Sequence, residues 1–184
     1  MNRHDDLIVH LFLLVHIARS AQMKRALTAV DPDPPLNFWR LIHGNQLDIA
    51  VLEWCKVFGS DAEPTHWKKL VPIADHDSFR SAMLTELGIN NDAWAAYWEE
   101  MKAYRDRLVS HHFEVPRLDK YPSVELALKS AYFYYKWLIR QLRGLGETKY
   151  PDDLAEYAAR FEAQAINIVR RAVAATSDMK ERVY

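Results

Sequence analysis

Residues 154–172 read LAEYAARFEAQAINIVRRA, and the apolar side chains in this stretch recur at steps of three and four. This spacing matches the turn of an α-helix and predicts one apolar stripe that faces a core. The stripe consists of Leu154, Tyr157, Phe161, Ala165, Ile168 and Ala172. Glu156, Arg160 and Arg171 are available to the other faces. No stretch of the chain shows comparable strand-type alternation, so we expect an all-α fold.

Prolines and glycines divide the rest of the chain into similar segments. Eight prolines lie between long proline-free stretches, and Gly59, Gly88, Gly144 and Gly146 fall at the ends of those stretches. These breakers predict helices at about 4–29, 36–58, 77–87, 91–113, 123–143 and 152–178. Gly44 lies inside the second segment, where it would either kink the helix or admit a close neighbour. We therefore expect an antiparallel helical bundle of about five to six helices, with residues 1–184 as a single domain.

Composition places the chain among globular proteins of a reducing compartment. Of its 184 residues, 49% are apolar and 27% are charged. The single cysteine, Cys55, excludes an intramolecular disulfide and a thiolate zinc cluster. Since Cys55 lies in a largely apolar helical run, we expect it to be buried as a small hydrophobe. A cytoplasmic protein without cofactor or metal is the expected class.

Charge and hydropathy limit the partners. The 24 basic and 25 acidic residues give a net charge of −1, so any contact with nucleic acid must be local. Residues 7–18, LIVHLFLLVHIA, are too few to span a membrane and contain His10 and His16. Because this stretch is apolar nearly all round, it is either central in the fold or covered by another chain. A homodimer would explain it, and no membrane partner is expected.

The segment expected at 91–113 carries the candidate chemistry in its last two turns. Its predicted buried stripe consists of Trp94, Tyr97, Trp98, Met101, Tyr104 and Leu108. The stripe is followed by residues 105–112, RDRLVSHH, in which Arg105 precedes His111 and His112. Arginine's fixed charge and planar fork suit phosphate oxygens, and histidine transfers protons near neutral pH. Together these residues suit a site that binds phosphate and transfers protons.

This segment resembles the Arg-x(4–6)-His signature of the HEPN superfamily, whose helical bundles include many metal-independent RNA-cleaving toxins. Arg105 and His111 form the matching pair, and Asp106 resembles the polar residue that follows the arginine. More loosely, residues 47–112 resemble HEPN proteins of the abortive-infection type through LEWCKVFGS, HWKKLV and YRDRLVSHH. His112 also fits the signature, after Arg105 or Arg107, so the motif histidine stays open between two positions.

The resemblance implies a metal-independent endoribonuclease of toxin or phage-defence type, with an Arg/His site at the cleft of a homodimer. Helical geometry bears on that site, because Arg105 and His111 are about 9 Å apart along the axis and about 120° apart around it. Arg105 and His112 are only about 20° apart. Either the helix loosens near Ser110 or two chains share the site, with the second chain supplying a histidine as acid.

Two other interpretations of the motif remain. Residues 105–107 can form a solvated helix face, with both histidines favouring the negative helix end. The protein would then be a non-catalytic HEPN-like interaction protein, paired with a cognate antitoxin or another defence protein. The discriminating observation is whether Arg105 and His111 line an open cleft.

Two weaker patterns in the sequence have simpler explanations. His4, His10 and His16 recur every six residues, which spreads them around a helix and does not build a metal site. The aromatic run at 132–135, followed by basic residues, could bind a single strand. Consecutive residues point to different faces, so core packing beneath a solvated basic face is the expected role.

Overall fold

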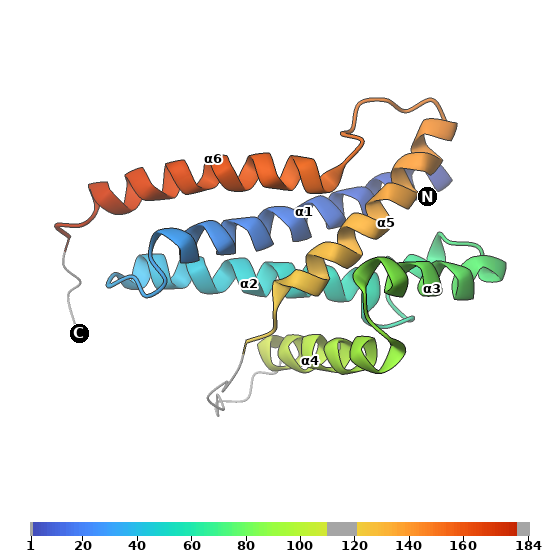
Figure 1. Ribbon diagram of the computed structural model, residues 1–184, viewed down its shortest axis with the longest axis horizontal. Helices are drawn as coiled ribbons and strands as arrows, with labels where there is room; N and C mark the ends of the chain where they lie inside the picture. Colours follow the sequence, from blue (N-terminus) through green and yellow to red (C-terminus); the bar gives the residue numbers. More distant parts are fainter. Residues whose placement is uncertain (1, 110–120, 180–184) are drawn as a thin grey trace.

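The computed structural model describes residues 2–109 and 121–179, and every regular element within these ranges is helical (Figure 1). The α-helices are α1 (Arg3–Val30), α2 (Asn37–Phe58), α3 (His76–Leu87), α4 (Asn91–Val109), α5 (Val124–Gly144) and α6 (Leu154–Ala175). Two short 3-10 helices that were not predicted, η1 (Trp67–Lys69) and η2 (Ile73–Asp75), connect α2 to α3. The all-α prediction is confirmed. The expected continuation of α4 to residue 113 lies outside the described residues.

Polar caps and glycine set several helix ends. Asn2, Ser123 and Asp153 precede α1, α5 and α6, and each side chain accepts a hydrogen bond from a backbone N–H of the first turn. Gly88 closes α3 at φ +72°, a left-handed conformation that glycine adopts without steric cost. Gly44 lies within α2, where an added Cβ would meet no atom within 4 Å, so it does not serve a close approach.

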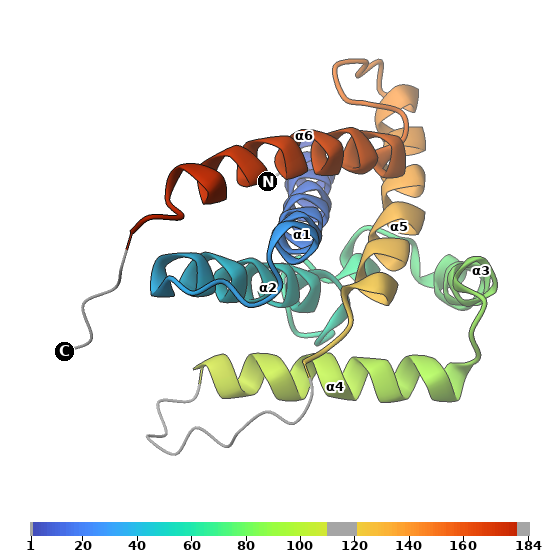
Figure 2. The same ribbon diagram turned by 60° about the vertical axis from the view of Figure 1, so that its left-hand side comes forward.

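The apolar first helix is central in the bundle. Figures 1 and 2 show α1 among α2, α5 and α6, which are its three main contact partners. Leu7, Leu11, Leu14 and Ile17 are each at most 1% exposed. These three helices cover most of residues 7–18, whereas Phe12 stays 47% exposed. By length and composition alone α1 could cross a membrane, as many core helices could, and 50% of its most apolar window is buried by the rest of the chain.

The helices around α1 differ in direction. Lys24 meets His43 and Leu27 packs with Trp39, so α1 and α2 are antiparallel as expected. Arg19 donates to Tyr157, and Leu27 also packs against Val169, so α6 runs parallel to α1. In Figure 2, α5 crosses this layer steeply. The antiparallel arrangement therefore holds for α1 with α2 and for α2 with α4, and it does not describe the whole bundle.

The apolar face of α6 is rotated by about one residue from its predicted position. Leu154 and Ala165 are buried as expected, but Ile168 is 59% exposed and Val169 is 5% exposed. Ala158 replaces Tyr157 as the second buried residue. Adjacent apolar residues satisfy the same periodicity, and packing against α1 decides which of them faces inward.

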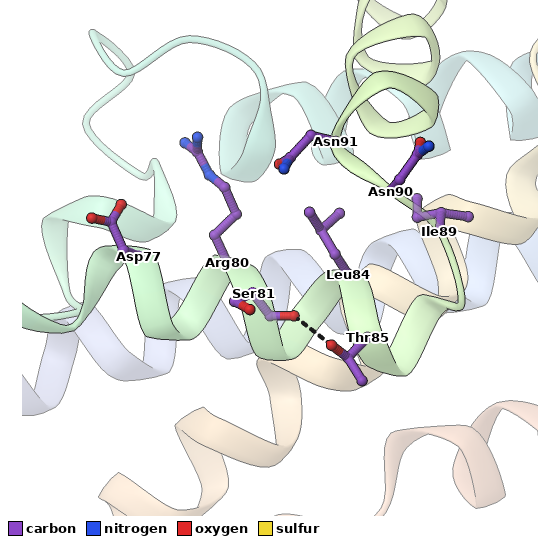
Figure 3. Close-up of a pocket in the computed structure, with 8 residues that line it drawn as sticks. All are labelled: Asp77, Arg80, Ser81, Leu84, Thr85, Ile89, Asn90 and Asn91. Atoms are coloured by element: carbon purple, nitrogen blue, oxygen red, sulfur yellow. Dashed lines mark hydrogen bonds between the residues drawn. The ribbon is translucent and has the colours of Figure 1, made fainter.

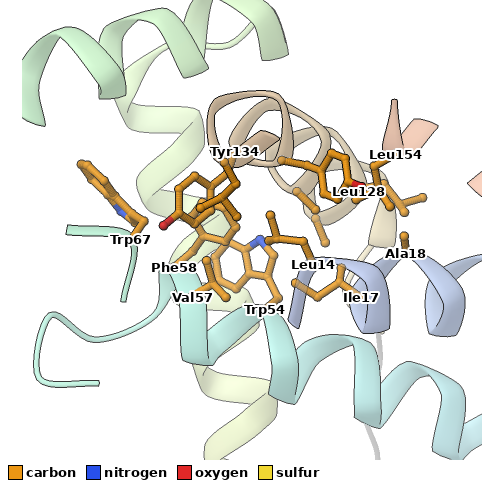
Figure 4. Packing of buried hydrophobic residues seen from close by; sticks show 14 of the residues in the cluster. Leu14, Ile17, Ala18, Trp54, Val57, Phe58, Trp67, Leu128, Tyr134 and Leu154 are labelled. Atoms are coloured by element: carbon orange, nitrogen blue, oxygen red, sulfur yellow. The ribbon is translucent and has the colours of Figure 1, made fainter. Parts of the chain in front are cut away.

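Aromatic side chains of α2 and α5 fill the core that supports α4. Figure 4 shows Trp54, Phe58 and Tyr134 in contact, and the Trp54 indole donates a 3.0 Å hydrogen bond to Ser130 Oγ. Tyr134 and Tyr135 are fully buried. The aromatic run of α5 therefore packs the core, and the expectation of a core role for it is confirmed.

Candidate functional site

α4 lies at the edge of the bundle, where it packs against α2 in antiparallel register (Figure 1). Tyr97, Met101 and Tyr104 are buried as predicted, and Trp94 and Trp98 are half-buried. The prediction is wrong for Leu108, which is 41% exposed. Tyr104 bonds to Asp48 of α2, and the same register brings Leu108 level with Gly44, which has no side chain to cover it.

Hydrogen bonds from α4 to α2 fix the helix along its length. The Trp98 indole donates to the carbonyl oxygens of Phe58 at 2.9 Å and Gly59 at 2.7 Å. Two turns later the Tyr104 hydroxyl donates to Asp48 Oδ1 at 2.6 Å. Burial and the neighbouring Asp48 carboxylate raise the pKa of Tyr104, so this hydroxyl keeps its proton at neutral pH. The backbone that carries Arg105 is therefore held in place.

Arg105 and Asp106 form a local pair in the last described turns of α4. Arg105 Nε and Nη2 both donate to Asp106 Oδ1, at 2.9 and 2.7 Å. The Arg105 side chain is 20% exposed, and that of Asp106 is 62% exposed. Among the described residues, only Asp106 Oδ1 accepts from the guanidinium, which leaves Arg105 donors that a phosphate could use. Asp106 thus holds the Arg105 guanidinium beside its own turn of α4.

The surroundings of Arg105 are polar on one side and buried on the other. Cys55 lies on the α2 side, 1% exposed, and its thiol contacts the Met101 carbonyl oxygen at 3.8 Å. Burial raises the pKa of Cys55 to about 11, so it stays a neutral thiol, and the expected buried role is confirmed. Burial alone would lower the pKa of Arg105, but the hydrogen bond to Asp106 and the charge of Glu63 raise it. Arg105 is a permanent cation.

His111 and His112 lie outside the described residues, so no distance joins either histidine to Arg105. The described chain resumes at Tyr121, whose ring lies edge-on to Tyr104 with centroids 6.3 Å apart. The chain therefore leaves and re-enters the described structure near the same end of α4. This end is where we place the candidate site.

A cavity of about 450 Å³ opens beside Tyr104 and Tyr121, and it contains groups that the sequence did not suggest. The Lys24 ammonium donates to His43 Nδ1 at 2.7 Å, and His43 Nε2 lies 3.0 Å from Thr28 Oγ1. Burial lowers the pKa of Lys24, and burial with the charge of Lys24 lowers that of His43. His43 is therefore a neutral acceptor at neutral pH.

Lys24 and His43 could not be identified from motif spacing. They are 19 residues apart on two helices, and only the antiparallel packing of α1 on α2 joins them. Arg40 lines the same cavity. The cavity thus adds cations and a neutral imidazole to the end of the bundle that carries Arg105.

The three histidines of α1 lie in different environments. His10 is buried and its Nδ1 lies 2.9 Å from the Tyr134 hydroxyl, whereas His4 and His16 are exposed. Within residues 2–109 and 121–179, no group of three His, Cys, Asp or Glu side chains is placed to hold a metal ion.

Comparison with known proteins identifies no relative of this chain. No protein-family model, no curated protein and no solved structure matches it. A function is therefore argued from the residues at the end of α4.

Proposed function

We propose that the protein is a HEPN-like, metal-independent endoribonuclease that acts as a homodimer in the cytoplasm. The observation that carries the proposal is the Arg105–Asp106 pair, a braced and permanently charged guanidinium in the last described turns of α4. The chain continues directly from these turns to His111 and His112. The resemblance to toxin and phage-defence HEPN proteins supplies the biological setting of the proposal.

The proposed reaction is transesterification within the RNA strand. The ribose 2′-oxygen attacks the adjacent phosphorus while a base removes its proton, and the 5′-oxygen of the next nucleotide leaves with a proton from an acid. His111 is the proposed acid or base, and His112 is the alternative. Arg105 binds the phosphate oxygens, whose negative charge develops at the crowded phosphorus, and Asp106 orients Arg105.

The homodimer is proposed because the reaction needs two proton-transfer groups. A two-fold axis near the end of α4 would bring the same residues of both chains to one cleft. The partner's motif would then supply the second histidine. This argument does not depend on α1, most of whose apolar side chains the bundle covers.

A second candidate is a non-catalytic interaction protein of the same HEPN-like type, the partner of an antitoxin or of another defence protein. One observation favours it: the charge of Arg105 is already balanced by Asp106 and by nearby Glu63. An arginine that is 20% exposed and paired within its own helix also fits a structural role.

Cleavage of synthetic RNA by the purified protein separates the two candidates. Single-stranded and hairpin RNAs are incubated with the protein in excess EDTA, and the same sequences with 2′-deoxyribose serve as controls. The nuclease proposal predicts cleavage in EDTA, products that end in a 2′,3′-cyclic phosphate, and intact deoxy controls. Cleavage that appears only after divalent metal is added would contradict the proposed mechanism. A folded dimer that cleaves no RNA would favour the interaction protein.

A further inference from the structure

A pocket of about 210 Å³ lies between the first half of α4 and the segment that joins α2 to α3. Three tryptophans, Trp67, Trp94 and Trp98, contribute to its wall. The volume is below the roughly 300–1,000 Å³ of sites for drug-sized ligands, so the pocket suits a single planar ring system. We call it the tryptophan pocket.

The aromatic wall is held rigidly before any ligand arrives. The Trp98 indole N–H is bonded to the carbonyls of Phe58 and Gly59, which fixes the plane of its ring. Trp67 stacks on Phe79 with centroids 4.7 Å apart and planes 18° apart. Trp94 packs at 5.7 Å from the Trp54 centroid. A preorganised aromatic wall loses little conformational entropy when a flat ligand binds.

An arginine without a bonding partner stands at the mouth of this pocket. Arg80 of α3 is exposed, and within the described residues it makes no hydrogen bond or salt bridge. It also lines a neighbouring hollow of about 430 Å³, into which Figure 3 shows it extending from α3 opposite Asn91. Asp61 at the same pocket pairs with Lys68 at 2.5 Å, and its charge also interacts with that of Arg80. Because no described residue accepts a hydrogen bond from Arg80, its guanidinium donors are available to a ligand.

A row of four side chains on α4 leads from the pocket toward Arg105. Trp94, Trp98, Lys102 and Arg105 follow each other at steps of four, four and three. They fall within an arc of about 80° on the helix and span about 16 Å along its axis. The Lys102 ammonium lies 3.8 Å from the Trp98 ring centroid. The two tryptophans of this row are therefore directly adjacent to its two cations.

We infer that the tryptophan pocket binds a base of single-stranded RNA, with Arg80 and Lys102 holding the phosphates on either side. Aromatic faces stack any base, and adjacent cations follow the backbone, which is the chemistry that single-strand binders use. The bases of a duplex are paired and stacked, so they could not enter. Asp61 at the rim is exposed, so beside its bond from Lys68 its carboxylate can accept a hydrogen bond from a base N–H group.

This inference rests on the proposed function, because it names the form of RNA that the Arg105 site receives. The row directs a strand bound in the pocket toward Arg105. Arg80 and Trp94 have no part in the proposed bond cleavage. Binding and cleavage can therefore fail separately.

The test is equilibrium binding of a fluorescent single-stranded oligonucleotide with 2′-O-methyl ribose, which cannot be cleaved through the 2′-oxygen. We expect Arg80→Glu and Trp94→Ala each to raise the Kd at least about tenfold, since loss of one base–aromatic stack has an effect of this size. Arg170→Glu on α6 is the matched control, because Arg170 is also an exposed arginine in a helix, and its Kd should change little. A duplex of the same sequence should bind more weakly than the single strand.

Three results would overturn the inference. They are wild-type affinity in Arg80→Glu and Trp94→Ala, equal loss of affinity in Arg170→Glu, and pocket-dependent binding of a mononucleotide as tight as that of the oligonucleotide. Arg80→Glu is the decisive variant, because Arg80 is exposed and its replacement should leave the melting temperature unchanged. Reduced binding by this variant would support the pocket even if no RNA is cleaved. Cleavage with unchanged binding would support the nuclease and reject the pocket.

Discussion

Asp106 holds Arg105 through a single carboxylate oxygen, which accepts from Nε at 2.9 Å and from Nη2 at 2.7 Å. The two residues are consecutive in α4, so the brace needs no other element of the fold. The two hydrogen bonds limit the directions in which the guanidinium can point, and they leave its other N–H groups available to a ligand. The candidate site is therefore preorganised on the arginine side.

Asp106→Ala should reduce RNA cleavage by about tenfold, because Arg105 would lose the group that orients it. Asp106→Asn retains an acceptor oxygen and should have the smaller effect. Stability should change little, since Asp106 is 62% exposed. Single-turnover cleavage and thermal melting measure the two quantities. Unchanged cleavage in a folded Asp106→Ala protein would reject the orienting role.

His111→Ala should reduce cleavage on the order of 10²-fold or more while helix content and melting change little. His112→Ala should be the milder change. A structural histidine at the helix end would instead cost on the order of 1 kcal/mol of stability and leave cleavage nearly intact. Equal cleavage by wild type and His111→Ala, assayed on structured and single-stranded RNA, excludes the catalytic role of His111. A larger loss in His112→Ala would select the other spacing of the motif.

Light scattering at micromolar concentration should give the mass of a dimer, because the proposed site takes its second histidine from a partner chain. Dilution that dissociates the dimer should lower cleavage per chain. A monomer that cleaves RNA at an undiminished rate per chain would refute the shared site while leaving the motif itself intact.

Buried His10 should make the protein less stable at mildly acidic pH. Burial lowers its pKa to about 4, against a smaller opposing effect of Asp6. Between about pH 6.5 and 4 the unfolded chain binds a proton at His10 that the folded chain excludes, so the free energy of unfolding falls as the pH falls. From pH 7 to pH 5 this histidine should contribute a loss on the order of 2 kcal/mol.

Urea unfolding of wild type and His10→Gln at the two pH values measures this effect. Glutamine keeps a hydrogen-bonding group but does not titrate, so the variant should depend less on pH. His66 is also buried with its pKa lowered to about 4, so part of the dependence should remain. An identical pH dependence in His10→Gln and wild type would show that His10 is not the titrating group.

Helical periodicity and chain breakers were enough to predict the helices, because both act within a few residues of one another. They did not determine how helices pack. In α6 both Ile168 and Val169 fit an apolar stripe, and only contact with α1 buries the second. For residues 7–18 the sequence allowed a central helix or a dimer surface, and contacts with α2, α5 and α6 show that the helix is central, with Phe12 left 47% exposed.

The candidate site was predictable only where its residues are neighbours in sequence. Arg105 and Asp106 are consecutive, so the motif could identify their pairing. Lys24 meets His43, and Arg80 faces the tryptophans of α4, only through tertiary packing. The half-buried state of Trp94 and Trp98 was also missed, because periodicity distinguishes the faces of a helix but not how fully each is covered.

Cleavage of RNA by Arg105→Ala tests the central claim most directly. Arg105 is 20% exposed and, among the described residues, bonds only to its neighbour Asp106, so the variant should fold and melt like wild type. In EDTA, its single-turnover cleavage of single-stranded RNA should fall on the order of 10²-fold or more. Arg105→Lys should recover part of the rate, because lysine keeps the positive charge but lacks the planar guanidinium. A well-folded Arg105→Ala protein that cleaves at the wild-type rate would contradict the account.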